Sequence, residues 1–253
     1  MTYGAILFDL FDTLVRFDRS RLPEVQINGR TVRSTAGHLF PILAPYAPGV
    51  DLARFFEALI WSWQEAERMR AVDHHEVAAP ERFRLLFCHL GLDPTRISSE
   101  VVQALLNTHK HYLSQAAEFP PPHRAVLSTL SRRYRLGIVS NFDYAPTAHG
   151  ILDREGVAGL FQAVVISAEV GWRKPNPIIF EAALRHLSVA PREALFIGDR
   201  PDIDVLGAKG VGMDVAWLNP DGEPVPPGIP APEYEVKALT EIGPLLASGE
   251  PGL

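Results

Sequence analysis

The chain has 253 residues, of which 47% are hydrophobic and 21% are charged, and its formal net charge is −6. A chain of this length and apolar content can bury a sizeable core in one large α/β domain, or in a domain with an inserted second module. The acidic balance and the lack of a long basic run argue against a nucleic-acid-binding surface. The composition therefore indicates a globular protein that does not bind nucleic acid.

Cysteine content and the distribution of apolar residues exclude further classes. Cys88 is the only cysteine, so the chain has neither an internal disulfide nor a cysteine-based zinc site, and we expect Cys88 to fill a small buried space. No apolar segment is long enough to cross a bilayer, and no basic leader precedes the first apolar run. We therefore expect a cytoplasmic protein without a membrane partner.

The first element is the apolar run Ile6–Phe8, which leads directly into Asp9. An apolar run of this kind predicts a buried strand, and in an open α/β sheet the reactive groups lie just past the carboxyl ends of such strands. A carboxylate at that position can attack an electrophile and form a covalent intermediate. A turn or a helix N-cap is an alternative role for Asp9 that this stretch alone leaves open.

The next hundred residues predict helices rather than buried strands. A small hairpin comes first, near residues 25–33, because Asn28-Gly29 favours the type I′ turn that a two-residue hairpin loop needs. Helical spacing of apolar residues and capping residues then predict four helices. These cover residues 34–43, the segment that follows Asp51, residues 81–90, and the segment from Ser98 or Ser99 to about 112.

Helix and strand patterns alternate after the proline run 120–122. The expected strands are 136–139, 163–166, 194–197 and 214–218, each preceded by a helical segment (about 123–133, 147–155, 177–187 and 203–209). This alternation predicts a Rossmann-like parallel sheet with right-handed crossovers, an α/β fold. We predict a core domain of residues 1–17 and 119–253, interrupted by an inserted, mainly α-helical cap domain of residues 18–118.

Polar residues follow the predicted strands at the edge where Asp9 is expected. Ser140-Asn141 follow one strand and Gly198-Asp199 another, while Lys174 lies in the segment between them. Because a carboxylate nucleophile and a phosphate dianion repel each other, such a site needs positive charge, which Lys174 supplies. The same anion can accept hydrogen bonds from the Ser140 hydroxyl. It can also accept them from the backbone N–H groups just after Asp9 and from the N–H of Asn141.

A divalent cation fits the same set of residues. Asp9 and Asp199 offer oxygen ligands, which suit Mg²⁺. A cation held there would neutralise charge that develops during phosphoryl transfer.

These four segments together resemble the haloacid dehalogenase (HAD) superfamily of hydrolases with a helical C1-type cap. The resemblance implies that Asp9, in Asp9-Leu10-Phe11-Asp12-Thr13-Leu14, is the nucleophile and Ser140 the hydroxyl of the second motif, followed by Asn141. It also implies that Lys174, in Arg-Lys-Pro-Asn-Pro, is the lysine of the third motif. Asp199 and Asp204 correspond to the two acids of the fourth motif. The implied metal ligands are Asp9, the backbone carbonyl of Phe11, Asp199 and Asp204, and the implied phosphate-binding residues are Leu10, Phe11, Ser140, Asn141 and Lys174.

The sequence departs from the family pattern at Phe11, where family phosphatases carry a second aspartate that acts as general acid and base. Asp12 stands one residue later, where glycine is usual, and in an extended backbone its side chain would point to the other face. Three functions remain open. One is a Mg²⁺-dependent phosphatase, acting on a small phosphorylated metabolite through an aspartyl-phosphate on Asp9. The others are a 2-haloacid dehalogenase-like hydrolase and a weakly active binding or regulatory protein.

Gly198-Asp199 favours the phosphatase, because HAD-type dehalogenases need no metal and lack this pair. The cap is expected to set the identity of the substrate. Asp143, just after Ser140-Asn141, either orients the second-motif loop or serves a turn. Nothing in the sequence indicates an oligomeric state.

Overall fold

The computed structural model describes residues 3–248, which group into two compact units. The first unit contains residues up to Phe17, 118–142 and 152 onward, and the second contains 18–117 and 143–151. Residues 143–151, within the predicted core domain, group by their contacts with the second unit. Residues 1–2 and 249–253, which the prediction also assigned to the core domain, lie outside the described part of the chain.

A parallel sheet of six strands forms the centre of the first unit, in the order β10-β9-β8-β1-β6-β7. Its strands are β1 (Ala5–Phe8), β6 (Arg135–Ser140), β7 (Ala163–Ile166), β8 (Ala194–Gly198), β9 (Asp214–Leu218) and β10 (Tyr234–Val236). The α/β fold predicted from the sequence is confirmed, and β10 is a further strand within the proline-rich C-terminal segment. β1 lies between β6 and β8, and all four of its side chains are fully buried.

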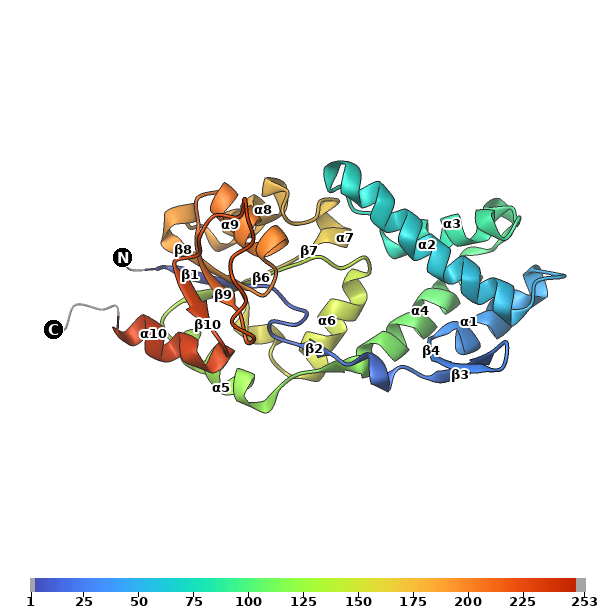
Figure 1. Ribbon diagram of the computed structural model, residues 1–253, viewed down its shortest axis with the longest axis horizontal. Helices are drawn as coiled ribbons and strands as arrows, with labels where there is room; N and C mark the ends of the chain where they lie inside the picture. The colour runs from blue at the N-terminus through green and yellow to red at the C-terminus, as the bar shows by residue number, and fades with distance from the viewer. Residues whose placement is uncertain (1–2, 249–253) are drawn as a thin grey trace. The chain divides into compact units, whose positions relative to one another are not determined.

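Helices cover both faces of this sheet. In Figure 1, α8 (Pro177–Leu187) and α9 (Leu206–Gly210) lie on one side of the strands, while α5 (Pro121–Leu130) and α10 (Ile242–Ser248) lie on the other. Side chains of β1 therefore point alternately into two apolar layers. The core beneath α8 contains Leu7, Phe180 and Phe196, the last two with their rings edge to face at 5.2 Å.

A side-chain cap fixes the start of α8. α8 begins at Pro177, and the Asn176 side chain caps it by accepting a hydrogen bond from the N–H of Ile178 at 3.0 Å. This unit also contains the helix α7 (Ser167–Val170) and the strand β2 (Arg16–Phe17), which pairs with β5 (Ala117–Glu118).

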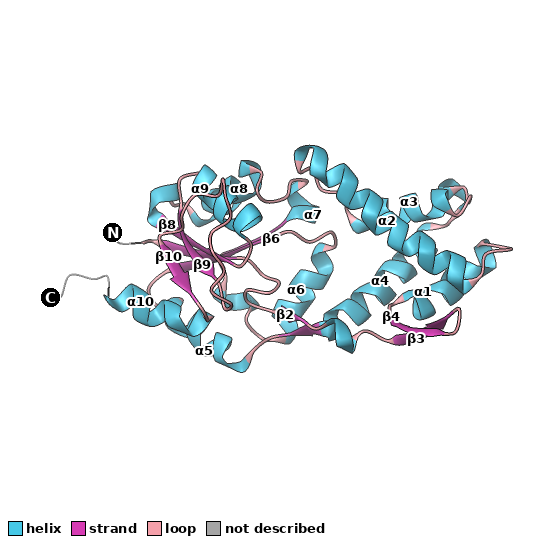
Figure 2. Cartoon of the chain, viewed as in Figure 1, coloured by secondary structure: helices cyan, strands magenta, loops and turns pink. Residues whose placement is uncertain are grey.

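The second unit is mainly helical, as the cyan helices of Figure 2 show. It contains α1 (Ala36–Leu43), α2 (Leu52–Asp73), α3 (Ala79–His89), α4 (Ser99–Ala116), most of α6 (Ala145–Arg154), and the antiparallel hairpin β3 (Glu24–Ile27) and β4 (Arg30–Arg33). Asn28 and Gly29 both have positive φ in the hairpin turn, at 50° and 75°. That conformation matches a type I′ turn, which explains why this dipeptide occurs there.

Apolar faces of α1, α2, α3 and α4 form the core of the helical unit. Asp51 caps α2 by accepting a hydrogen bond from the N–H of Arg54 at 2.8 Å. Cys88 is exposed, so the expected burial of its side chain is wrong: on α3 its neighbours Leu86 and Phe87 face the core instead. None of the helices within residues 3–248 is both long enough and apolar enough to cross a bilayer.

Candidate active site

The predicted site begins with three residues at adjacent strand ends. Asp9 follows β1, Ser140 is the last residue of β6, and Asp199 follows β8. The N–H of Asp9 donates to the carbonyl of Ile197 at 2.8 Å, which continues the ladder between β1 and β8 by one residue. Because these strands are parallel neighbours, their carboxyl ends bring the three side chains to one edge of the sheet.

Lys174 reaches this edge from the loop that precedes α8. Its Nζ lies 2.5 Å from Oδ1 of Asp9 and 2.8 Å from Oδ1 of Asp204, and the residue is only 2% exposed. The Asn141 side chain fixes the loop: its Oδ1 accepts from the Lys174 N–H at 2.7 Å, and its Nδ2 donates to the Lys174 carbonyl at 3.0 Å. Asn141 therefore positions the lysine through its backbone.

Asp9, Asp199 and Asp204 form a compact acidic cluster. One carboxylate oxygen from each lies within 4.8 Å of the others. The fit is tight because Gly198 leaves no side chain in the way: a Cβ at that position would lie 2.4 Å from Oδ2 of Asp204. That same oxygen accepts a hydrogen bond from the Arg200 N–H at 3.0 Å. A set of carboxylate oxygens is the donor chemistry that hard divalent cations take, so these residues fit such an ion.

The charges in the cluster are unequal, since one ammonium group faces three carboxylates. Burial, which disfavours the charged form, raises the pKa of Asp9 to about 7; Lys174 opposes this rise, and the other two acids add to it. Burial and the nearby Asp204 carboxylate likewise raise the pKa of Asp199 to about 6. Burial would lower the pKa of Lys174, but the carboxylates of Asp204 and Asp9 outweigh it and raise that pKa. The lysine is thus charged, but its single positive charge does not balance the three carboxyl groups around it.

A cavity of ≈ 210 Å³ opens onto these groups. It is lined by Asp9, Phe11, Asp12, Ser140, Asn141, Arg173, Lys174, Asp199, Arg200, Ile203 and Asp204. The Ser140 hydroxyl is buried and has no hydrogen-bond partner among the described residues, so it is available to a bound oxyanion. Of the residues predicted to bind phosphate, only Leu10 does not line the cavity. Its side chain is fully buried, so its predicted contact would come from the backbone N–H.

Phe11 stands at the position where the phosphatases of the resembling family carry a second aspartate. Its ring lines the cavity and packs against Phe142, with 4.6 Å between ring centroids and 31° between planes. Asp12 also lines the cavity, because the backbone turns there with a φ of 65° and does not stay extended. Its Oδ1 accepts a hydrogen bond from the N–H of Phe17 at 3.2 Å, which stabilises this left-handed conformation. Glycine adopts a positive φ more readily than other residues, which accounts for a glycine being usual at this position.

Two arginines at the cavity were not among the predicted site residues. Arg173 and Arg200 line it, each next in sequence to a predicted residue, and this adjacency was the available signal. The Arg200 guanidinium pairs with the exposed Asp202 carboxylate at 2.9 Å.

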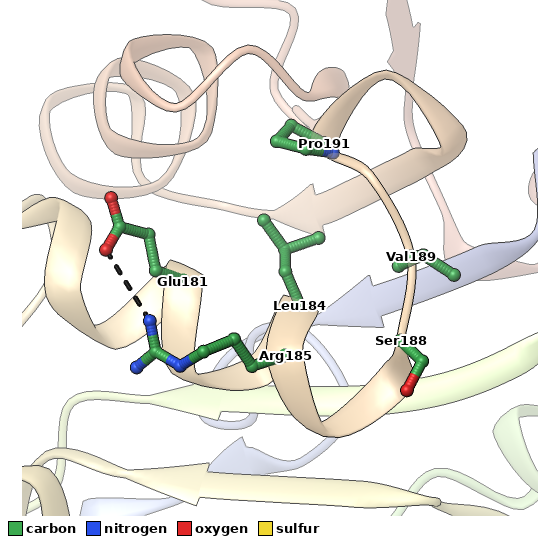
Figure 3. Close-up of a pocket in the computed structure, with 6 residues that line it drawn as sticks. All are labelled: Glu181, Leu184, Arg185, Ser188, Val189 and Pro191. Carbon is green, nitrogen blue, oxygen red and sulfur yellow. Dashed lines mark ion pairs between the residues drawn. The ribbon is translucent and has the colours of Figure 1, made fainter.

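A second depression lies at the opposite ends of the strands, near the end of α8 and the start of β8 (Figure 3). It is lined by Glu181, Leu184, Arg185, Ser188, Val189 and Pro191. Glu181 and Arg185 form an exposed ion pair at 3.7 Å, so the only charged groups in this lining neutralise each other. This depression lacks the convergent reactive groups of the first cavity.

Comparison with known proteins identifies the family. The sequence model of the family of haloacid dehalogenase-like hydrolases matches residues 3–212. The chain belongs to the haloacid dehalogenase-like hydrolases. It is 34% identical over 214 residues to the glyceraldehyde 3-phosphate phosphatase of Methanopyrus kandleri, covering 83% of this chain and 81% of the relative. It is 30% identical over 243 residues to the enzyme of that name from Pyrococcus furiosus, covering 95% and 90%.

The solved structure of a 2-haloacid dehalogenase from Pseudomonas syringae pv. Tomato DC3000 shares the HAD fold, with a TM-score of 0.72 and 23% identity over 98% of this chain and 99% of that one. The predicted membership, a HAD-like hydrolase with an α/β core, is confirmed, and the phosphatases among its relatives bear out a hydrolase of the phosphatase type. The buried acidic cluster is compatible with the cation that HAD hydrolases generally use.

Proposed function

We infer that this HAD hydrolase is a Mg²⁺-dependent phosphatase that transfers the phosphoryl group of a small metabolite to Asp9 and then to water. The observation that carries this proposal is the contact of Asp9 with Lys174 at 2.5 Å inside a cluster of three carboxylates. A buried nucleophile, an ammonium group and oxygen ligands for a cation within one cavity are what phosphoryl transfer through a covalent intermediate requires.

Each remaining residue has a role in the proposed reaction. Lys174 supplies the positive charge that lets the phosphate dianion approach the Asp9 carboxylate. The unpartnered Ser140 hydroxyl and the N–H groups of Leu10, Phe11 and Asn141 donate to phosphoryl oxygens. These donors hold the phosphorus in line with the attacking oxygen of Asp9.

The proposed metal site consists of the carboxylates of Asp9, Asp199 and Asp204 with the backbone carbonyl of Phe11. Bound there, Mg²⁺ supplies positive charge that offsets the carboxylates and the developing charge on the phosphoryl group. The donor set supports this choice because all three side-chain ligands are oxygens, and their positions within 4.8 Å suit a single ion.

Phe11 restricts the leaving groups that the site can handle well. No carboxyl group is present at position 11 to protonate a departing alkoxide. A general acid contributes about 10²–10⁴-fold, so we expect esters with acidic leaving groups, such as acyl and aryl phosphates, to react faster than alkyl phosphates. The named relatives act on glyceraldehyde 3-phosphate, and we include this triose phosphate as a candidate substrate.

Phosphate release by purified protein tests the proposal. The substrates are p-nitrophenyl phosphate, acetyl phosphate, glyceraldehyde 3-phosphate and, for dehalogenation, L-2-chloropropionate, each with Mg²⁺ and with EDTA. The proposal expects phosphate release that needs Mg²⁺ and disappears in Asp9→Asn. Halide release in EDTA would replace it with a dehalogenase, and binding of phosphate without turnover would replace it with a binding protein.

The division into a core domain of residues 1–17 and 119–253 and a cap domain of residues 18–118 remains part of the proposal, as does the cytoplasmic location. The partner that we propose is a phosphorylated small molecule.

A further inference from the structure

The helical unit contains a cluster of buried charged groups that the proposed reaction does not use. Arg70 of α2 and Arg82 of α3 have side chains that are only 6% exposed. Arg70 Nε lies 2.8 Å from Glu76 Oε1, and Arg82 Nε donates to Oδ2 of Asp143 at 3.0 Å. Nη2 of Arg70 lies 3.6 Å from the same Asp143 oxygen. Asp143, 15% exposed, is therefore held by two guanidinium groups.

Charge balance makes Asp143 the essential partner of Arg82. The Arg82 guanidinium also contacts the imidazole of His109, whose Nε2 lies 3.1 Å from Nη2 of the arginine. Since guanidinium only donates, Nε2 accepts, and the ring proton is on Nδ1, 3.0 Å from Oγ1 of Thr35. The imidazole is thus neutral, and the charge of Arg82 is compensated by Asp143. Removing a charged pair from water costs free energy, so stability alone does not account for the pair of Arg82 and Asp143.

The position of Asp143 in the chain suggests an answer. The chain passes from the first unit to the second between Phe142 and Asp143. Phe142 is fixed within the first unit, because its N–H donates to Ser167 Oγ at 2.9 Å and its carbonyl accepts from that hydroxyl at 3.2 Å. Asp143 is fixed within the second unit by Arg82 and by the Ala79 N–H, which donates to its carbonyl at 2.7 Å. Two consecutive residues are therefore anchored separately.

The residues just before this junction belong to the active site. Ser140 lines the cavity and its hydroxyl has no hydrogen-bond partner in the described part of the chain, and Asn141 holds Lys174 by two hydrogen bonds to its backbone. The loop has only Asn141 and Phe142 between the end of β6 and Asp143. A change in backbone direction at Asp143 would therefore be absorbed by Asn141 or Phe142, because a loop this short has few other rotatable bonds.

We propose that Asp143 is a positioning residue, whose carboxylate, held by Arg82 and Arg70, fixes the exit of the 140–142 loop and so keeps Asn141 bonded to Lys174. This inference rests on the proposed role of Lys174 in binding phosphate. Asp143 touches no substrate in this scheme and acts on the reaction only through Asn141.

The test compares Asp143→Asn with Glu76→Gln, a matched control. Each variant removes one negative charge from the same cluster: Asp143→Asn takes a carboxylate from Arg82 and Arg70, and Glu76→Gln takes one from Arg70. Only Asp143 continues into the active-site loop. Both variants are studied below their unfolding transitions, and the loss in unfolding midpoint is measured for each so that a general destabilisation is accounted for.

Two measurements separate positioning from stability. The first is hydrogen exchange at the Lys174 amide, which reports directly on its bond to Asn141 Oδ1. We expect faster exchange in Asp143→Asn and wild-type exchange in Glu76→Gln. The second is phosphate release from p-nitrophenyl phosphate, where kcat should fall on the order of tenfold or more in Asp143→Asn and stay within about twofold in Glu76→Gln.

Equal behaviour of the two variants in the exchange measurement, whether both change or neither does, would overturn the positioning role. Wild-type exchange at Lys174 in Asp143→Asn would do so whatever happens to kcat. If wild-type protein released no phosphate from any ester, the phosphatase proposal would fail alone, because the exchange measurement would still decide the role of Asp143.

Discussion

Replacing His109 by glutamine should reduce the pH dependence of the unfolding free energy between pH 7 and pH 5. Burial of the imidazole, and then the charge of Arg82, lower the pKa of His109 to about 3. In the unfolded chain a histidine titrates near 6.5, so between these values the unfolded state binds more protons than the folded state. The stability that comes from the neutral ring is therefore present above about pH 6.5 and is lost as the pH falls.

The size of the effect follows from the two pKa values. A site that titrates at about 3 when folded and about 6.5 when unfolded removes about 2 kcal/mol of unfolding free energy on going from pH 7 to pH 5. Glutamine does not titrate. Its side-chain oxygen can still accept a hydrogen bond from Nη2 of Arg82, which lies 3.1 Å from Nε2 of His109 in the wild type. The variant should lack this loss while keeping the hydrogen bond.

Urea unfolding at pH 5, 6 and 7, in the presence of a chelator, measures the difference. The raised pKa values of Asp9 and Asp199 have the opposite sign: they favour folding as the pH falls. They act equally in wild type and variant and cancel when the two curves are subtracted. His111→Gln, at an exposed position on the same helix, is the control for replacing a histidine by glutamine. Parallel curves for wild type and His109→Gln would refute the assignment of a neutral imidazole with a lowered pKa.

Two further substitutions test the site directly. Phe11→Asp should raise turnover of alkyl phosphates by up to about 10²–10⁴-fold and that of p-nitrophenyl phosphate much less, because only the alkoxide needs a proton. Phe11→Asn is its uncharged control, and equal gains in both variants would show that proton donation is not the cause. Gly198→Ala should weaken Mg²⁺ activation of phosphate release by about 10- to 100-fold, because the new Cβ would lie 2.4 Å from Oδ2 of Asp204 and displace it. Gly159→Ala, where a Cβ meets no atom within 4 Å, should leave activation unchanged, and an unchanged Gly198→Ala would contradict the tight fit.

Much of the fold was predictable because its signals are local. Ala5–Phe8 is a continuous apolar run, and in the structure every one of its side chains is fully buried between two parallel neighbours. Once the strands are recognised, parallel pairing brings Asp9, Ser140 and Asp199 to one edge without further information. The convergence of the predicted site residues on one cavity thus follows from topology, not from any single motif.

Other features carried no local signal. β10 contains only three residues within a proline-rich segment, too few for a periodic pattern to identify. The turn at Asp12 depends on a positive φ that a non-glycine residue adopts only when its surroundings fix it. The pair of Arg82 and Asp143 joins residues 61 positions apart, and neither residue stands in a pattern that predicts its partner. Such pairings are set by tertiary packing, which a single sequence does not encode locally.

Lys174 differs from the other site residues in how it is positioned. Asp9, Ser140 and Asp199 are at or next to the ends of hydrogen-bonded strands, which fix their backbones. Lys174 lies in a loop, and the side chain of Asn141 supplies two of the bonds that a strand neighbour would give. The segment that starts at Ser140 therefore has two tasks, to present a hydroxyl and to hold the lysine. A shift in its backbone would disturb both at once, so an anchor at its exit would protect both the hydroxyl and the lysine.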